Sequence, residues 1–331
     1  MSDTPSRRTR HVAAALCLVV AALFVPGAAV AQTYPDRPVR VIVPFAAGGG
    51  SDVVGRAIAQ KLQDKFGQPF VVENRTGAGG SIGATQLARA APDGYTLLLG
   101  SSSEIAQYPN VKADVPYDSI KDFAPIAAVA TVPLALAVRQ DLPVTTVAQL
   151  LDYARKNPGK LNYGSAGPGS TTHLAVALLT SMTGTEMTHV PYKGSAPVIT
   201  DLLAGTLDLS ISTMPAVLPH AGGGKIRILG VSTAERAKAL PDVATIDEGG
   251  VKGYATGLWT GLLAPAGTSP QIIARLNAAV NEALATDDLK TLLAKQGAEP
   301  TGGTSEKFRE EIKRDLAVWN DVVKKTGIKI D

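Results

Sequence analysis

A glycine-rich turn between a strand-like and a helix-like segment most constrains what this chain can fold into. The turn reads PFAAGGGSD at residues 44–52, and the apolar run VRVIV precedes it. The amphipathic run VVGRAIAQKLQDKF follows it. A strand, a glycine turn and a helix in succession are typical of an α/β fold, in which ligands bind where strands end. The sequence therefore predicts an α/β fold with a binding site at this turn.

Strand-like and helix-like patterns alternate along the rest of the chain, which indicates a mostly parallel sheet. The strand, glycine turn and helix near residues 41–60 have an echo near 161–180, where LNYGSAGPGS precedes a helical pattern. This echo predicts two similar α/β domains facing one another. The other expected strands lie at 69–73, 95–100, 134–139, 188–192, 207–212, 226–232 and 257–267, and the clearest helices at 147–156 and at the C-terminal end.

The first 31 residues have the pattern of a secretory signal peptide. Three arginines precede the apolar stretch 12–25, and Ala29-Val30-Ala31 matches a cleavage site. A permanent anchor is the alternative, but a membrane span takes about 20 residues. We expect cleavage after Ala31 and a periplasmic mature protein. Cys17, the single cysteine, lies in this segment, so the mature chain has no disulfide.

The charge balance of the chain argues against two classes of partner. The net charge is +3, and removing the three arginines and one aspartate of the first 31 residues leaves +1. Such a chain has no basic field to attract nucleic acid or an anionic membrane surface. Hydrophobic residues make up 45% of the chain, which suffices for a sizeable core.

Nucleotide motifs do not fit the first turn. A Walker A loop requires Lys-Ser/Thr after its last glycine, where this chain has Ser51-Asp52. The dinucleotide pattern G-x-G-x-x-G fails because Val53 occupies its last position. We therefore expect no cofactor.

Small anions remain as candidates for the turns. Backbone N–H groups at a helix start favour an anion, and Gly48 to Gly50 allow close approach to the backbone. We expect Asp52 to cap its own helix. The turn at 164–172 adds hydroxyls, including that of Thr172, and the turn at 77–81 adds further amides before a helix capped by Ser81. These turns contain few cations and suit a carboxylate better than a polyphosphate.

The sequence gives little evidence for a metal site or for a nucleophilic catalytic site. His173, His189 and His220 lack metal-ligand spacing, so we expect no metal. A hydrolase that uses Ser170 and His173 is an alternative, although residues three apart on a helix are seldom aligned as nucleophile and base. We expect a binding protein and not an enzyme.

Six segments in order resemble one family: 39–56, 71–84, 88–101, 161–175, 190–209 and 261–270. The chain resembles the extracytoplasmic solute receptors of tripartite tricarboxylate transporters, the Bug (Bordetella uptake gene) family. The resemblance implies a type II periplasmic-binding-protein fold with two Rossmann-like domains around a ligand cleft. Residues 32–132 with 254–331 would form domain 1, and 133–253 would form domain 2.

The resemblance also implies the function and the partners. The protein would capture a small carboxylate (amino acid, dicarboxylate or aromatic acid) by closure of its lobes and deliver it to membrane permease subunits. We expect a monomer. A ligand sensor without a transporter is the alternative from within this class.

The implied ligand-binding residues lie on both domains. Domain 1 contributes the turn after the first strand and the residues after LLLG, and domain 2 contributes the GSAGPGSTTH segment, the PYKG turn and a strand end. The residues are Phe45, Ala46, Ala47, Gly48, Gly49, Ser51, Asp52, Ser101, Glu104, Ser165, Ala166, Gly167, Ser170, Thr171, His173, Lys193, Gly194, Ser195 and Asp208.

Glu104 departs from the residues that the family commonly has at that place. If its carboxylate faces the cleft, the ligand carries one carboxylate and a neutral or cationic far end. The alternative, which we favour, is that Glu104 points to solvent, since glutamate is rarely buried unpaired. Lys193 would pair with the ligand or with Asp208, or be a solvated loop lysine.

Overall fold

The computed structural model describes residues 34–330. The predicted signal peptide and its cleavage site lie outside these residues. All helices and strands of the described chain fall between residues 37 and 330. None of these helices is both long enough and apolar enough to cross a membrane.

The first sheet has six strands in the order β11-β4-β10-β3-β1-β2. Strands β1, β2 and β3 run parallel, and β10 runs antiparallel to both β3 and β4. The central strands are almost completely buried, as continuous apolar runs such as VRVIV predict. The strands are β1 (Val39–Val43), β2 (Phe70–Asn74), β3 (Thr96–Ser101), β4 (Phe123–Val132), β10 (Leu258–Pro265) and β11 (Glu299–Pro300).

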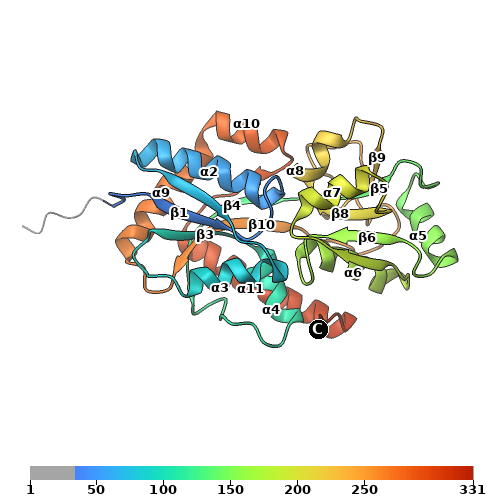
Figure 1. The fold of residues 1–331 in the computed structure, drawn as a ribbon, viewed down its shortest axis with the longest axis horizontal. Coiled ribbons are helices and arrows are strands. Elements are labelled where there is room, and N and C mark those ends of the chain that lie inside the picture. The colour runs from blue at the N-terminus through green and yellow to red at the C-terminus, as the bar shows by residue number, and fades with distance from the viewer. Residues whose placement is uncertain (1–33, 331) are drawn as a thin grey trace, which may run out of the picture. The chain divides into compact units, whose positions relative to one another are not determined.

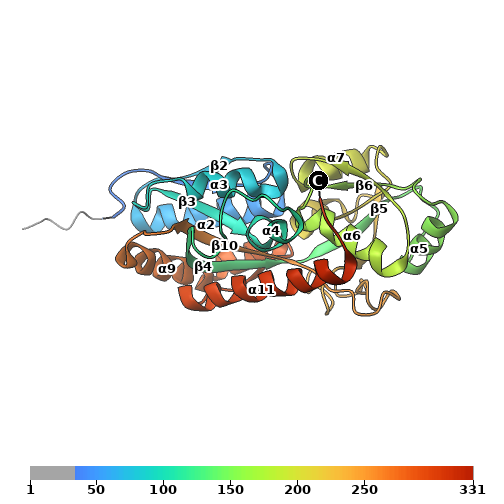
Figure 2. The same ribbon diagram turned by 90° about the horizontal axis from the view of Figure 1, so that it is seen from below.

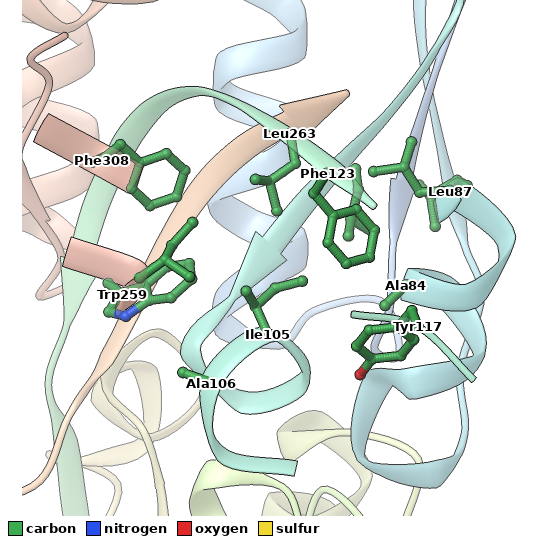
Figure 3. Packing of buried hydrophobic residues seen from close by; sticks show 13 residues of the cluster. Ala84, Leu87, Ile105, Ala106, Tyr117, Phe123, Trp259, Leu263 and Phe308 are labelled. Carbon is green, nitrogen blue, oxygen red and sulfur yellow. The ribbon is translucent and has the colours of Figure 1, made fainter. Parts of the chain in front are cut away.

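Helices cover both faces of this sheet (Figures 1 and 2). On one face lie α2 (Gly50–Phe66) and α9 (Pro270–Ala285), and on the other lie α3 (Ser81–Ala88) and α11 (Ser305–Thr326). The apolar face of α11 inserts Phe308 and Ile312 into a cluster with Trp259 and Leu263 of β10 (Figure 3). The smaller elements here are η1 (Ala78–Gly80), η2 (Ser103–Gln107), α4 (Tyr108–Val111) and α10 (Asp287–Lys295).

The second sheet has five strands in the order β7-β6-β8-β5-β9. Strands β6, β7 and β8 run parallel, and β5 runs antiparallel to its neighbours β8 and β9. The strands are β5 (Leu134–Arg139), β6 (Asn162–Ser165), β7 (Thr188–Pro191), β8 (Leu209–Thr213) and β9 (Ile226–Val231). The helices are α5 (Val147–Lys156), α6 (Thr171–Thr183), α7 (Ser195–Leu203), α8 (Met214–Val217) and η3 (Leu218–His220).

The two sheets repeat one topology. The order β2-β1-β3-β10-β4 matches β7-β6-β8-β5-β9 strand for strand, with β10 and β5 as the antiparallel members. The chain passes from the first sheet to the second after β4 and returns before β10. We call the part around the first sheet lobe 1 and the part around the second lobe 2. The two-lobe α/β architecture is confirmed, while the domain boundaries at 132/133 and 253/254 stay predictions.

Two helix starts differ from the predicted capping. The N-cap of α2 is Gly49, and that of α3 is Gly80; neither carries a side-chain cap. Asp52 lies inside the first turn of α2, and Ser81 is the first residue of α3. Glycine caps leave the first N–H groups of a helix without a side-chain acceptor from the cap residue.

Candidate functional site

A narrow cavity lies where loops of both lobes meet. Its walls come from the loops after β1 and β3 in lobe 1, from the loop after β6 and the end of β8 in lobe 2, and from the starts of α7 and β10. Ligand sites in open α/β sheets lie at such carboxyl ends. The cavity measures about 20 Å³, room for about one water molecule. Its lining is Phe45, Gly49, Gly50, Ser51, Ser103, Ala166, Ser170, Thr171, Thr172, Ser195, Thr213 and Leu258.

The loop after β1 is held by the carboxylate of Asp52. One oxygen, Oδ2, accepts hydrogen bonds from Gly48 N at 2.9 Å and from Arg56 Nε at 3.0 Å. The other, Oδ1, accepts from Asn74 Nδ2 at 2.9 Å, and the same amide donates to Phe45 O. Burial raises the pKa of Asp52, but the hydrogen bonds from Arg56, Gly48 and Asn74 outweigh it and leave this pKa below its usual value. Asp52 therefore braces the loop as an anion.

The loop after β6 satisfies most of its own hydroxyls. Ser170 Oγ accepts from His173 N at the start of α6, and Thr172 Oγ1 accepts from Ala166 N at 2.8 Å. Ser165 Oγ accepts from Gly167 N and lies 2.6 Å from His189 Nε2. By contrast, Thr171 Oγ1 is buried at the cavity and has no hydrogen-bond partner. This hydroxyl is available to a ligand.

The lobes touch across the cavity through three hydrogen bonds. Ala46 N donates to Lys193 O at 2.9 Å, and Gly50 N donates to Thr213 Oγ1 at 3.2 Å. Thr171 N donates to Ser103 Oγ at 3.3 Å. Gly50 permits this approach, because a Cβ there would lie 2.9 Å from Thr213 Cβ. The structure is a closed form.

No charged side chain belongs to the cavity lining. Helices α2 and α6 both begin at the cavity, and the first N–H groups of a helix lack intrahelical acceptors and carry partial positive charge. Together with the hydroxyls of Ser51, Ser195 and Thr171, these groups can bind an anion without a fixed cation. Phe45 and Leu258 supply apolar surface for carbon atoms.

Seven predicted site residues line the cavity: Phe45, Gly49, Ser51, Ala166, Ser170, Thr171 and Ser195. The sequence analysis named Gly50 only as a glycine that lets a ligand approach, and it missed Ser103, Thr213 and Leu258 as lining residues. Ser103 and Thr213 follow or end the equivalent strands β3 and β8, so their place at carboxyl ends is a usable signal. Leu258 opens the return strand β10, which no motif marks.

Eight other predicted residues belong to the same loops without lining the cavity: Ala46, Ala47, Gly48, Asp52, Ser101, Ser165, Gly167 and Gly194. They shape the walls. Gly194, for example, leaves space for Ala46 of the other lobe, since a Cβ on Gly194 would lie 2.9 Å from Ala46 N. The turn at 77–81 is also a support, because Gly79 packs against Pro168 and Tyr108.

The predicted solvent-facing orientation of Glu104 is wrong. Its side chain is completely buried, and its carboxyl is hydrogen-bonded to Ser101 N and Ser101 Oγ. It does not line the cavity either. A local hydrogen-bonded turn thus satisfies a carboxyl for which we expected solvent.

Asp208 is also misplaced by the sequence prediction. It precedes β8, whereas Thr213 at the other end of that strand reaches the cavity. Its carboxylate accepts from Arg139 Nε at 2.9 Å and from Asn162 N at 2.7 Å. The predicted pair of Asp208 with Lys193 is therefore wrong, and Lys193 is exposed.

His173 supports the loop after β6 from behind. Its Nδ1 accepts a hydrogen bond from Gly169 N at 3.0 Å, which requires an unprotonated Nδ1. Its ring stacks on His189 at a centroid distance of 4.1 Å. Burial, with a smaller contribution from His189, lowers the pKa of His173 to about 4. The ring is thus engaged by Gly169 and not by the Ser170 hydroxyl, so the pair that the hydrolase alternative requires is not formed.

Among the described residues, no group of three or more His, Cys, Asp or Glu side chains is arranged to hold a metal ion. The carboxylates discussed above are each engaged by hydrogen-bond donors of the protein. The candidate site is therefore an uncharged cavity between two lobes, lined by apolar surface and by several hydroxyl-bearing side chains.

Comparison with known proteins matches most of the chain to one family. Residues 54–328 match the family model described as "Tripartite tricarboxylate transporter family receptor". The chain is 39% identical to Protein BugT of Bordetella pertussis over 95% of this chain and 98% of that protein. It is 38% identical to a UPF0065 protein from the tcbD-tcbE intergenic region of Pseudomonas sp. strain P51, over 88% and 87%.

Several solved structures are similar to this chain over most of its length. The structure titled "R. palustris Rpa4515 with adipate" has a TM-score of 0.87 at 42% identity, covering 89% of this chain and 99% of that one. Periplasmic binding protein BugD has a TM-score of 0.86 at 35% identity, over 89% and 99%. MatC of Rhodopseudomonas palustris with bound malate has a TM-score of 0.85 at 34% identity, over 88% and 100%.

Proposed function

Because this chain belongs to the tripartite tricarboxylate transporter receptor family, we propose that it captures a small carboxylate between its two lobes and delivers it to a membrane transporter. The family resemblance of the six sequence segments is confirmed. The family consists of receptors, which agrees with the expectation that the protein is not an enzyme.

The observation that carries this proposal is the chemistry of the cavity lining. Two helix starts and several hydroxyls converge on one narrow space, and Thr171 Oγ1 is buried there without a partner. A buried, unsatisfied hydroxyl costs about 1–3 kcal/mol. A carboxylate oxygen would accept its hydrogen bond, together with those of the helix-start amides that Thr213, Ser103 and Ser170 do not already engage.

The relatives narrow the size of the ligand. Two similar structures are those of Rpa4515 with adipate and of MatC with bound malate, and both compounds are dicarboxylates. Neither fits a cavity of about 20 Å³, so a bound dicarboxylate would hold the lobes further apart than they stand in this structure. Each lobe alone offers part of the hydrogen bonds, and a ligand that contacts both lobes favours their closure around it.

The cellular location and the partners of the protein are proposed from the same receptor family. We propose that the mature protein acts in the periplasm as a monomer after removal of residues 1–31. The closed form would present the ligand to the permease subunits. The residues proposed to contact the ligand are those that line the cavity.

A thermal-shift screen of residues 32–331 tests the proposal. The protein is first unfolded and refolded to remove carried ligand. It is then screened against mono-, di- and tricarboxylates, amino acids and aromatic acids, with the matching amides as controls. A ligand at about 100 times its Kd adds roughly 2.7 kcal/mol of stability. We expect a carboxylate to raise the Tm while its amide does not; a folded sample that no carboxylate stabilises would refute the proposal.

A further inference from the structure

Glu104 is a completely buried carboxyl without a cationic partner. It lies in η2, a π-helical turn that directly follows β3. Oε1 accepts a hydrogen bond from Ser101 N at 2.5 Å, and Oε2 lies 2.6 Å from Ser101 Oγ. Tyr117 Oη donates to the backbone carbonyl of Glu104 at 2.5 Å. These bonds fix the turn, but none of them neutralises a negative charge.

The carboxyl lies directly behind the wall of the cavity. A Cβ built on Gly80 would lie 2.9 Å from Glu104 Oε2 and 3.1 Å from Phe45 Cζ. These two atoms are therefore at most about 6 Å apart. Phe45 lines the cavity, and so does Ser103, the residue next to Glu104 in the chain. The carboxyl thus lies close to two residues that line the space in which the ligand would bind.

The surroundings of Glu104 offer no countercharge. The titratable group that faces it is Tyr117, from the segment after α4, and Tyr108 at the start of α4 lies near Tyr117 in turn. Burial raises the pKa of both phenols, so both are neutral near pH 7. Burial also raises the pKa of Glu104 to about 7, against the opposing effect of the Ser101 hydrogen bonds. No lysine, arginine or histidine of the described chain contributes to this shift.

We propose that Glu104 is a positioning residue that couples capture of an anionic ligand to the uptake of one proton. This inference rests on the proposed carboxylate receptor function. A ligand carboxylate in the cavity repels a charged Glu104 through the low-dielectric interior. A proton from solvent joins Oε2, which then donates to Ser101 Oγ, while Oε1 still accepts from Ser101 N. The turn keeps its geometry, and the second negative charge is removed.

Glutamine at this position mimics the protonated carboxyl. Its carbonyl can accept from Ser101 N, and its amide can donate to Ser101 Oγ, as the protonated acid does. A merely structural Glu104 would lose affinity to the same extent at every pH when replaced. A proton-linked Glu104 gives a pH-dependent wild type and a pH-independent variant.

Calorimetric titration of refolded wild type and Glu104→Gln with adipate and malate, between pH 6.0 and 8.5, separates these cases. The second carboxyl of each ligand is still partly protonated at pH 6.0, so the effect of Glu104 is read as the difference between wild type and Glu104→Gln at each pH. For wild type we expect affinity to fall about fivefold or more as the pH rises, within the range of typical coupling between sites. Titration at pH 7.5 in buffers of different ionisation enthalpy should show net proton uptake. Glu104→Gln should keep the pH 6.0 affinity throughout and take up no proton.

Glu186→Gln is the matched control, since Glu186 is exposed and precedes β7, at the end of lobe 2 away from the cavity. It should behave as wild type. Ligand binding by wild type without pH dependence or proton uptake overturns the inference and leaves the receptor function intact. An equal loss of affinity at all pH values in Glu104→Gln overturns it as well. If Glu104→Gln does not fold, the proton count of the wild type decides. If no carboxylate binds at all, the proposed function fails and the inference with it.

Discussion

At the scale of single residues, Thr171 is the residue best placed to bind a ligand. Its hydroxyl is buried, lines the cavity and has no partner in the protein, whereas the neighbouring hydroxyls of Ser170 and Thr172 are engaged within their own loop. A side chain that satisfies nothing inside its own fold is free to serve a ligand without loss of stability.

Thr171→Val removes this hydroxyl at nearly constant volume. We expect carboxylate affinity to fall about tenfold, because a hydrogen bond to a charged group contributes roughly 1.5–3 kcal/mol. Without ligand, the Tm should rise above that of wild type, because the variant no longer buries an unsatisfied hydroxyl. Calorimetry with the best carboxylate of the screen measures the loss, and Thr171→Ser, which keeps the hydroxyl, is the control. Unchanged affinity in the valine variant would remove Thr171 from the site.

Glu104 makes a separate prediction about stability. Its folded-state pKa, about 7, lies above the usual value of 4.5, so the folded protein binds more protons than the unfolded chain between these values. Folding free energy from Glu104 is thus fully present below about pH 4.5 and is lost as the pH rises through 7. The loss is roughly 3 kcal/mol.

Denaturant unfolding of wild type and Glu104→Gln between pH 4.5 and 8 measures this difference. His173, whose lowered pKa destabilises the fold as the pH falls below 6.5, acts in both proteins and cancels. Relative to the variant, the wild type should become steadily less stable up to about pH 7 and then level off. Parallel pH curves would mean that Glu104 stays ionised throughout.

Single residues also mark the limit of sequence prediction. Phe45, Ser51 and Thr171, which line the cavity, were identifiable because the family resemblance implies them and their motifs stand at the junctions of strands and helices. The burial of Glu104 was not identifiable, because it depends on a π-helical turn that returns the carboxyl to Ser101. The pairing of Asp208 with Arg139 joins β5 to the start of β8 across 69 residues, and no local pattern encodes it.

At the scale of elements, the contact between β10 and α11 depends on the absence of a side chain. A Cβ on Gly261 would lie 2.1 Å from Phe308 Cζ, and Phe308 belongs to the cluster shown in Figure 3. Phe308 also meets Trp259 edge to face, with ring centroids 5.2 Å apart. Helix α11 is therefore packed against β10 through one glycine and two aromatic rings.

Gly261→Ala should destabilise the protein by about 1–3 kcal/mol, the usual effect of overpacking a core. Denaturant unfolding gives the value. Gly257→Ala is the matched control, since nothing lies within 4 Å of the corresponding Cβ. Equal stability of the two variants would show that Phe308 moves aside without cost.

The elements that sequence patterns missed have a common cause. The apolar run of β4, FAPIAAVATV, shows no alternation and is rich in alanine, so it predicts neither strand nor helix clearly. Helix α5, by contrast, has a side-chain cap at Thr146 and an amphipathic pattern, and its bounds match the prediction. Local signals identify elements that carry their own caps, while tertiary pairing makes strands such as β4.

For the whole molecule, closure depends on a few close contacts between the lobes. The Gly50 to Thr213 approach is one of these, and it involves neither hydrophobic core. A ligand completes these contacts, and its affinity includes the free energy of closing.

Gly50→Ala should hinder closure and leave each lobe folded. We expect carboxylate affinity to fall more than tenfold, because the new methyl group would meet Thr213 at 2.9 Å. Small-angle scattering should show ligand-induced contraction of wild type and of the control Gly222→Ala, whose Cβ would have no neighbour within 4 Å. Contraction of Gly50→Ala to the same extent would contradict this role of the contact.

The repeated lobe was predictable because the strand, glycine turn and helix near 41–60 recur near 161–180, and both units became β1-α2 and β6-α6. The shared strand order of the two sheets was not predictable from this echo, because the crossings before β5 and β10 exchange chain between the lobes. Six ordered motifs identified the family, whereas the alternation of strand-like and helix-like patterns indicated only an α/β protein.

The central claim is that the cavity selects the carboxylate group itself. Calorimetric titration of the refolded wild-type protein with adipate, malate and the strongest carboxylate of the screen, each against its amide, tests it most directly. The account predicts one-to-one binding of at least one carboxylate and no detectable binding of its amide. Equal binding of acid and amide, or no binding of any carboxylate by the folded protein, would contradict it.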